Sequence, residues 1–304
     1  FVGPPADAGP GARARGRPRV VGYRGSAAEP GEELSVGDDF FLQIQDYATS
    51  EYMSLLGPTL IRLCAPQDLE ALLADADRAR GTGEFAAFAT NPAVQFADRS
   101  AYAGDPTAVD GPSLRLWVDA DGAVSTSPDG ALLGDVSDGP AAIAAAWREI
   151  NRASARPCAV SLGRAVPEAV RVAALAVRPW LPDYLAALEA LKDLHARGHH
   201  DVQVSGFGGR RSPALAGVDG PEGPAGGAPV LLWTDRDSFL VEPRAGRSFR
   251  IDPATADAVE PLVALGSIEA AAAVVDPDRL RAVAASFAGV GVRLVRRSPV
   301  GAGA

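Results

Sequence analysis

Apolar and polar residues follow two different periods between residues 34 and 212. Short apolar runs, which are typical of strands, occupy 40–45, 59–64, 85–89, 93–96, 158–162 and 201–205. Leucines and alanines spaced three and four residues apart, which are typical of helices, occupy 66–80, 140–152 and 181–197. Strands interspersed with helices predict an α/β or α+β body, with the connectivity of its strands left open.

A further pair of apolar runs, Leu114–Val118 and Ala123–Thr126, flanks the sequence Asp119-Ala120-Asp121-Gly122. Because Asp-Gly tolerates positive φ, this arrangement predicts a β-hairpin. The same residues begin like a calcium loop, but no glutamate stands at the twelfth position. We therefore favour the hairpin.

Glycine and proline crowd residues 213–229, where neither a helix nor a central strand is expected. We expect a linker there, between the 34–212 body and a C-terminal domain over 230–298. Residues 1–33 are rich in proline, glycine, alanine and arginine, so we expect a disordered or extended segment, in which 19–23 is a candidate edge strand. Residues 299–304 form a short tail.

The C-terminal domain has a distinct order of elements. Apolar runs predict strands at 230–233, 239–242 and 247–251. Three helices follow, and their predicted N-caps are Asp252, Ser267 and Asp276. The run 292–295 predicts a final strand. Three strands, three helices and one strand indicate a winged-helix domain.

Charge narrows the possible partners. The 304 residues carry a net charge of −9, which argues against a general binder of nucleic acid or anionic membranes. Residues 230–304 contain nine acidic and nine basic side chains, so the excess negative charge lies upstream. No apolar run is long enough for a transmembrane helix, and the first residues lack the apolar core of a signal peptide. We expect a cytoplasmic protein whose two cysteines, Cys64 and Cys158, are buried reduced thiols.

The body contains few candidates for chemistry. His199 and His200 beside Asp201 suggest a metal or acid–base pair, but neighbouring residues point in different directions, so we favour a solvated loop. We expect His195 to be a half-buried helix residue. The glycines and arginines of 205–211 resemble a phosphate-binding loop, although no helix follows to supply its N-terminus. We predict no metal, no cofactor and no catalytic residue.

The C-terminal domain carries a more specific resemblance. The strings Gly246-Arg-Ser-Phe-Arg-Ile-Asp-Pro-Ala-Thr-Ala256, Gly266-Ser-Ile-Glu-Ala270 and Val275-Asp-Pro-Asp-Arg-Leu-Arg281 resemble the recognition element of pathways for ribosomally synthesised, post-translationally modified peptides. The small peptide chaperone of pyrroloquinoline quinone biosynthesis is the type example of this element. Pro261 departs from the family pattern and predicts a kink in the first helix. With 179–182 and 204–209, the whole chain also resembles the actinobacterial recognition proteins of daptide biosynthesis.

The resemblance implies how a peptide binds. A leader peptide would add as a strand beside 247–251 and pack against the helix at 276–289. The implied peptide-binding residues are Arg247, Ser248, Phe249, Arg250, Ile251, Arg279, Ala282, Val283 and Ser286. The three arginines would pair with acidic leader residues. The implied partners are the precursor peptide and the modifying enzymes of the same pathway, with no nucleic acid and no membrane.

Three functions remain open from the sequence. The first is a non-catalytic protein that binds the leader and presents it to modifying enzymes. The second is a modifying enzyme with its active site in the 34–212 body and a fused recognition domain. The third is a winged-helix transcription regulator, which the balance of Arg279 and Arg281 against Asp276 and Asp278 disfavours.

Overall fold

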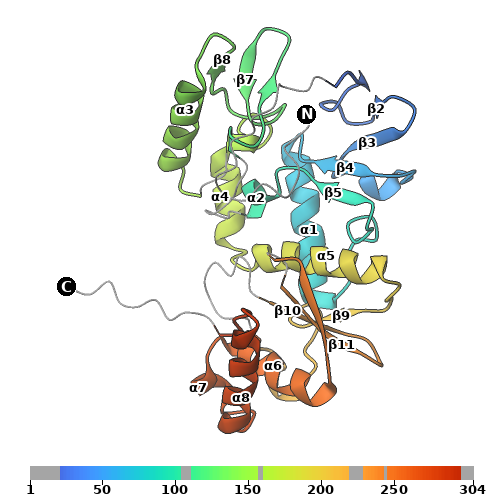
Figure 1. Ribbon diagram of the computed structural model, residues 1–304, viewed down its shortest axis with the longest axis vertical. Coiled ribbons are helices and arrows are strands. Elements are labelled where there is room, and N and C mark those ends of the chain that lie inside the picture. Colours follow the sequence, from blue (N-terminus) through green and yellow to red (C-terminus); the bar gives the residue numbers. More distant parts are fainter. Residues whose placement is uncertain (1–20, 104–110, 157–159, 219–228, 243–244, 296–304) are drawn as a thin grey trace, which may run out of the picture. The chain divides into compact units, whose positions relative to one another are not determined.

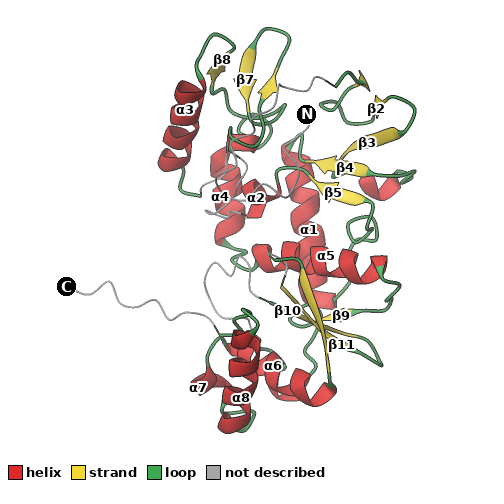
Figure 2. Cartoon of the chain, in the orientation of Figure 1, coloured by secondary structure: helices red, strands yellow, loops and turns green. Residues whose placement is uncertain are grey.

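The computed structural model describes residues 21–103, 111–156, 160–218, 229–242 and 245–295 (Figures 1 and 2). The chain divides into two compact units. Unit 1 comprises residues 1–72 and 93–174, and unit 2 comprises 73–92 and 175–304. Both units mix helices with sheets, which agrees with the α/β or α+β class expected of the body, whereas the winged-helix arrangement expected of 230–298 stays a prediction.

The larger sheet of unit 1 has five strands in the order β1-β2-β3-β4-β5. They span Arg24–Gly25, Glu33–Val36, Phe40–Asp46, Thr59–Arg62 and Val94–Phe96. The first three strands are antiparallel, whereas β3, β4 and β5 are parallel. The short helix η1 (Ser50–Tyr52) follows β3, and α1 (Pro66–Thr82) follows β4. The Asp68 carboxylate accepts hydrogen bonds from the amides of Ala48, Cys64 and Ala65, which fixes the chain where α1 begins.

A second, antiparallel sheet in unit 1 confirms the predicted hairpin. Its strands β6, β7 and β8 span Trp117–Val118, Ala123–Ser125 and Gly134–Asp135. Asp119 Oδ1 accepts the amides of Asp121 and Ala123, and Gly122 adopts a φ of +85°. Val124, Leu133 and Val160 pack with Ile143 of α3 (Pro140–Ala153) into a small core. The remaining elements are α2 (Arg99–Ala103), η2 (Val160–Leu162) and α4 (Glu168–Ala176).

Unit 2 contains an antiparallel sheet in the order β12-β11-β10-β9. The strands β9 to β12 span Gln203–Val204, Val230–Trp233, Ser238–Glu242 and Arg247–Ile251. β11 pairs with β12 so that Leu240 lies opposite Phe249. The helices are α5 (Leu181–Ala196), α6 (Pro253–Leu265), α7 (Ile268–Ala271) and α8 (Pro277–Gly289), with a short turn η3 (Pro213–Leu215).

The expected caps start the last three helices. Asp252 accepts the amide of Thr255, Ser267 accepts the amide of Ala270, and Asp276 accepts the amide of Arg279. Hydrogen bonds from the Thr255 hydroxyl and amide lower the pKa of Asp252, so this cap persists until the pH falls below the usual carboxylate range. α6 continues through Pro261, and α6 and α8 pack against each other.

Both faces of the β9–β12 sheet are covered. Leu231 and Leu240 lie on the face that packs on α6 and α8, in a core with Leu262, Leu280 and Phe287. α5 packs against β10 on the other side (Figure 1). The strands β10 and β11 are consequently buried on both faces, apart from their end residues, and the sheet lies between two layers of helix.

The division into units differs from the expected linker at 213–229. Residues 175–212, expected within the body, belong to the same compact unit as the C-terminal strands. The reason is a long-range ladder: Val204 of β9 lies opposite Leu232 of β10. Residues 219–228 lie outside the described residues.

Three predicted strands are wrong. Residues 85–89 form turns, in which the amide of Ala89 donates to the carbonyl of Ala86. The Phe85 ring packs against the rings of Tyr184 and Phe207, so side-chain packing takes the place of a strand ladder there. The described part of 158–162 is the short helix η2. Residues 292–295 form no strand, although Val292 and Leu294 are buried in the core beside α8.

The N-terminal segment is more ordered than expected where the structure describes it. Arg24–Gly25 and Glu33–Val36 are the strands β1 and β2, which add to the edge of the unit 1 sheet. Residues 1–20, which include the start of the candidate strand at 19–23, lie outside the described residues. The tail at 299–304 lies outside them as well. Among the described helices, each is too short or too polar to cross a bilayer.

The covered sheet generates a stability prediction. We expect Leu231→Ala and Leu232→Ala each to lower the free energy of unfolding by about 2–5 kcal/mol, because the two side chains are buried on opposite faces. Urea unfolding of the full chain measures both values. A change within about 0.5 kcal/mol for Leu232→Ala would mean that α5 leaves that face open.

Candidate functional site

The strand β12 lies at the edge of the unit 2 sheet. It pairs with β11 on one side, and among the described residues no strand pairs with its other side. The outer edge therefore offers main-chain N–H and C=O groups in a row of five residues. At the opposite edge of the sheet, β9 has only two residues. The β12 edge is thus the longer of the two free edges.

Alternation along β12 divides the predicted peptide-binding residues between two faces. Phe249 and Ile251 lie on the face that packs on the helices, and both are half-buried. Ser248 and Arg250 lie on the opposite face. The hydroxyl oxygen of Ser248 is buried and has no hydrogen-bond partner among the described residues.

The predicted helix residues lie on α8. The Phe249 ring meets the Phe287 ring edge to face, with 5.9 Å between their centroids, and Val283 packs on the same core. Arg279, Ala282 and Ser286 are exposed, and the Ser286 hydroxyl donates to the carbonyl of Ala282 at 3.0 Å. The apolar parts of both elements thus share one core, and small exposed side chains continue along α8.

Each predicted arginine has a partner within the chain. Arg247 donates to the Glu242 carboxylate at 2.9 Å and to the carbonyl of Gly291 at 3.1 Å. Arg250 forms an ion pair with Asp237. Arg279 donates to the carbonyl of Ala254 at the start of α6. The arginines therefore tie the edge strand and α8 to their neighbours.

The glycine-rich loop at 205–211 is held by a buried carboxylate that the sequence did not single out. Glu260 of α6 is fully buried. Its Oε1 accepts the Ser205 hydroxyl at 2.7 Å and the Arg211 amide at 2.8 Å, and its Oε2 accepts the Ser212 amide at 2.7 Å. The amides of Arg211 and Ser212 are thereby satisfied from within the protein. This network disfavours the phosphate-binding interpretation.

The histidines do not form a metal site. His195 Nδ1 lies 3.1 Å from the carbonyl oxygen of Thr90. The His199 ring packs against the Phe239 ring, with 4.7 Å between their centroids. Where the structure describes the chain, no group of three or more histidine, cysteine or carboxylate side chains is placed to hold a metal. Half-burial of His195 agrees with its predicted helix position.

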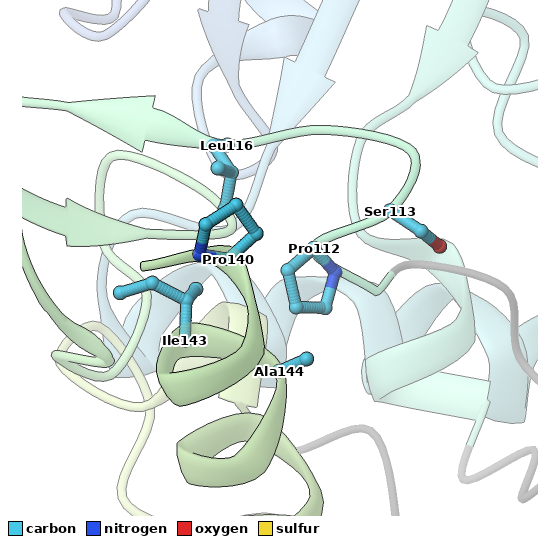
Figure 3. Close-up of a pocket in the computed structure, with 6 residues that line it drawn as sticks. All are labelled: Pro112, Ser113, Leu116, Pro140, Ile143 and Ala144. Atoms are coloured by element: carbon cyan, nitrogen blue, oxygen red, sulfur yellow. The ribbon is translucent and has the colours of Figure 1, made fainter. Parts of the chain in front are cut away.

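Unit 1 contains a small pocket of about 160 Å³ (Figure 3). Its lining is apolar apart from one serine and consists of Pro112, Ser113, Leu116, Pro140, Ile143 and Ala144. Ligand sites usually combine an apolar lining with several converging polar groups. This pocket lacks such groups among its lining residues and is smaller than most ligand sites.

Comparison with known proteins adds no relative: no family model, no curated protein and no solved structure matches the chain.

The Glu260 network generates a prediction. We expect Glu260→Ala to lower the free energy of unfolding by at least about 2 kcal/mol, because it leaves three donors without their acceptor. Glu269→Ala, at an exposed carboxylate on α7 outside this network, is the control and is expected to stay within about 0.5 kcal/mol. Urea unfolding measures both. Equal losses would contradict a specific role for Glu260.

A second prediction concerns Cys64, which is a free thiol but is half-buried and not fully buried as expected. Burial raises the pKa of Cys64 to about 12, and nearby Arg62 only partly opposes this. The reactive thiolate is therefore scarce near pH 8, and we expect alkylation by iodoacetamide at least about a hundredfold slower in the folded than in the urea-unfolded chain. Mass spectrometry separates Cys64 from Cys158, which lies outside the described residues. Similar rates in both states would contradict the prediction.

Proposed function

We propose that this protein binds the leader of a ribosomal precursor peptide as an added strand on β12 and presents it to modifying enzymes. The observation that carries the proposal is the free edge of β12 beside the shared apolar core of Phe249 and Phe287. The resemblance of residues 246–281 to peptide-recognition elements supports the same site.

The physical basis is main-chain pairing. A free sheet edge attracts extended peptides, and proteins commonly protect such edges with prolines, bulges or a covering element. Within the described residues, β12 carries no proline and pairs on one side only. An added peptide would gain main-chain hydrogen bonds from the strand and side-chain contacts from α8.

The contacts of the three arginines bear on which leader side chains would supply the affinity. Because Arg247, Arg250 and Arg279 already have partners, pairing with acidic leader residues would require those contacts to break. Phe249, Ile251 and Val283 are half-buried apolar side chains, so contacts between them and a leader would not require an ion pair to break. We expect apolar leader residues at alternate positions to supply most of the affinity.

A matched pair of helix variants tests the site. Ala282 and Ala288 are both exposed on α8, but only Ala282 lies on the predicted binding face. We expect Ala282→Trp to weaken leader binding at least about tenfold by filling the space beside β12, and Ala288→Trp to change it less than about twofold. Isothermal titration of the full chain measures binding, with synthetic leaders of the short precursor genes beside this gene as ligands.

Thermal melts establish that both variants fold. Equal effects of the two tryptophans would remove α8 from the site. Absence of binding by the wild-type chain to any of those leaders would overturn the proposed function.

A further inference from the structure

Unit 1 exposes a short apolar loop that the proposed function does not use. In residues 52–56, the side chains of Tyr52 and Leu56 are 83% and 74% exposed, and Met53 is 47% exposed. Single exposed apolar residues are ordinary, whereas several within five residues indicate an interaction surface.

The loop is fixed against the sheet. Gln43 of β3 is buried, and its side-chain oxygen accepts the amide of Leu56 at 2.8 Å, while its amide nitrogen donates to the carbonyl of Ser54 at 3.4 Å. The hydroxyl of Thr59 also donates to Gln43, at 3.1 Å. The exposed side chains therefore project from a backbone held in place by buried hydrogen bonds.

The sequence that precedes this loop is acidic. Residues 24–60 carry one basic side chain, Arg24, and seven acidic ones: Glu29, Glu32, Glu33, Asp38, Asp39, Asp46 and Glu51. Arg24 Nη2 lies 3.6 Å from Asp38 Oδ1. The Asp46 carboxylate accepts a hydrogen bond from the amide of Thr49. The other five carboxylates have no cationic partner in the part of the chain that the structure describes. Glu33 of β2 lies directly opposite Gln43, so its side chain points to the same sheet face as the loop contacts.

We propose that the surface formed by residues 52–56 and the carboxylates of Glu33 and Glu51 binds a basic segment of another protein, one that carries leucine-sized side chains among arginines or lysines. The apolar residues supply the contact area, and the carboxylates select the sign of the partner's charge. Nucleic acids and anionic membranes would be repelled, and so would the same surface of a second copy. This inference does not depend on the peptide site on β12.

The probe is a short synthetic peptide of alternating arginine and leucine, with arginine–serine and glutamate–leucine peptides as comparisons. Fluorescence anisotropy with the full chain measures binding, and thermal melts monitor folding. We expect the arginine–leucine peptide to bind at least about tenfold more tightly than either comparison peptide.

The variants distinguish binding at this surface from general attraction to an acidic protein. Glu33→Lys with Glu51→Lys should weaken binding at least about tenfold, and Tyr52→Ser with Leu56→Ser at least about fivefold. The control, Asp235→Lys with Glu269→Lys, makes the same change of net charge at exposed positions in unit 2 and should change binding less than about twofold. Ala282→Trp at the β12 site should also have no effect.

Several results would overturn the proposal. Equal weakening by the control pair would show only general attraction to an acidic protein. Equal binding of the arginine–serine peptide would remove the apolar loop from the interaction. Loss of binding in Ala282→Trp would place the peptide at β12 instead.

Discussion

The burial of β10 and β11 on both faces is the constraint on which unit 2 depends. Helices α6 and α8 cover one face and α5 packs on the other, so neither face of these strands is open to a ligand. A leader peptide of the kind proposed would therefore have to pair with this sheet at an edge. β12 provides that edge, and its apolar side chains stay half-buried because α8 covers them only in part.

Glu260 connects this sheet to the loop that follows β9. A buried carboxylate is unfavourable unless its oxygens are satisfied, and here two amides and one hydroxyl satisfy them. The network holds residues 205–212 against α6. Arg80 adds a second contact, because it donates to the carbonyl of Gly206 at 2.7 Å and stacks on Phe207. These interactions position β9 for its pairing with β10.

Local signals predicted local structure well. The caps at Asp252, Ser267 and Asp276 each depend on a side chain within three residues of the amide it accepts. The Asp-Gly turn of the hairpin is equally local. These features were predictable because their hydrogen bonds close within a few residues.

Features that depend on distant partners were not predictable in the same way. Phe85 and Val292 are apolar in sequence, and nothing local shows that side-chain packing replaces a strand ladder there. Val204 and Leu232 pair although a segment rich in glycine and proline separates them in the sequence. That segment led us to expect a domain boundary, whereas 175–212 and 230–295 belong to one unit. At the candidate site, the peptide position on β12 and α8 that the resemblance implies stays a prediction, and the resemblance did not reveal the partners of the three arginines.

The proposed function depends most directly on whether a leader pairs with β12. Hydrogen–deuterium exchange of the full chain, with and without a bound leader peptide, measures this at the level of single strands. We predict that alternate amides of residues 247–251 become protected on binding, while those of β9 do not change. Binding without added protection of β12 would contradict strand addition.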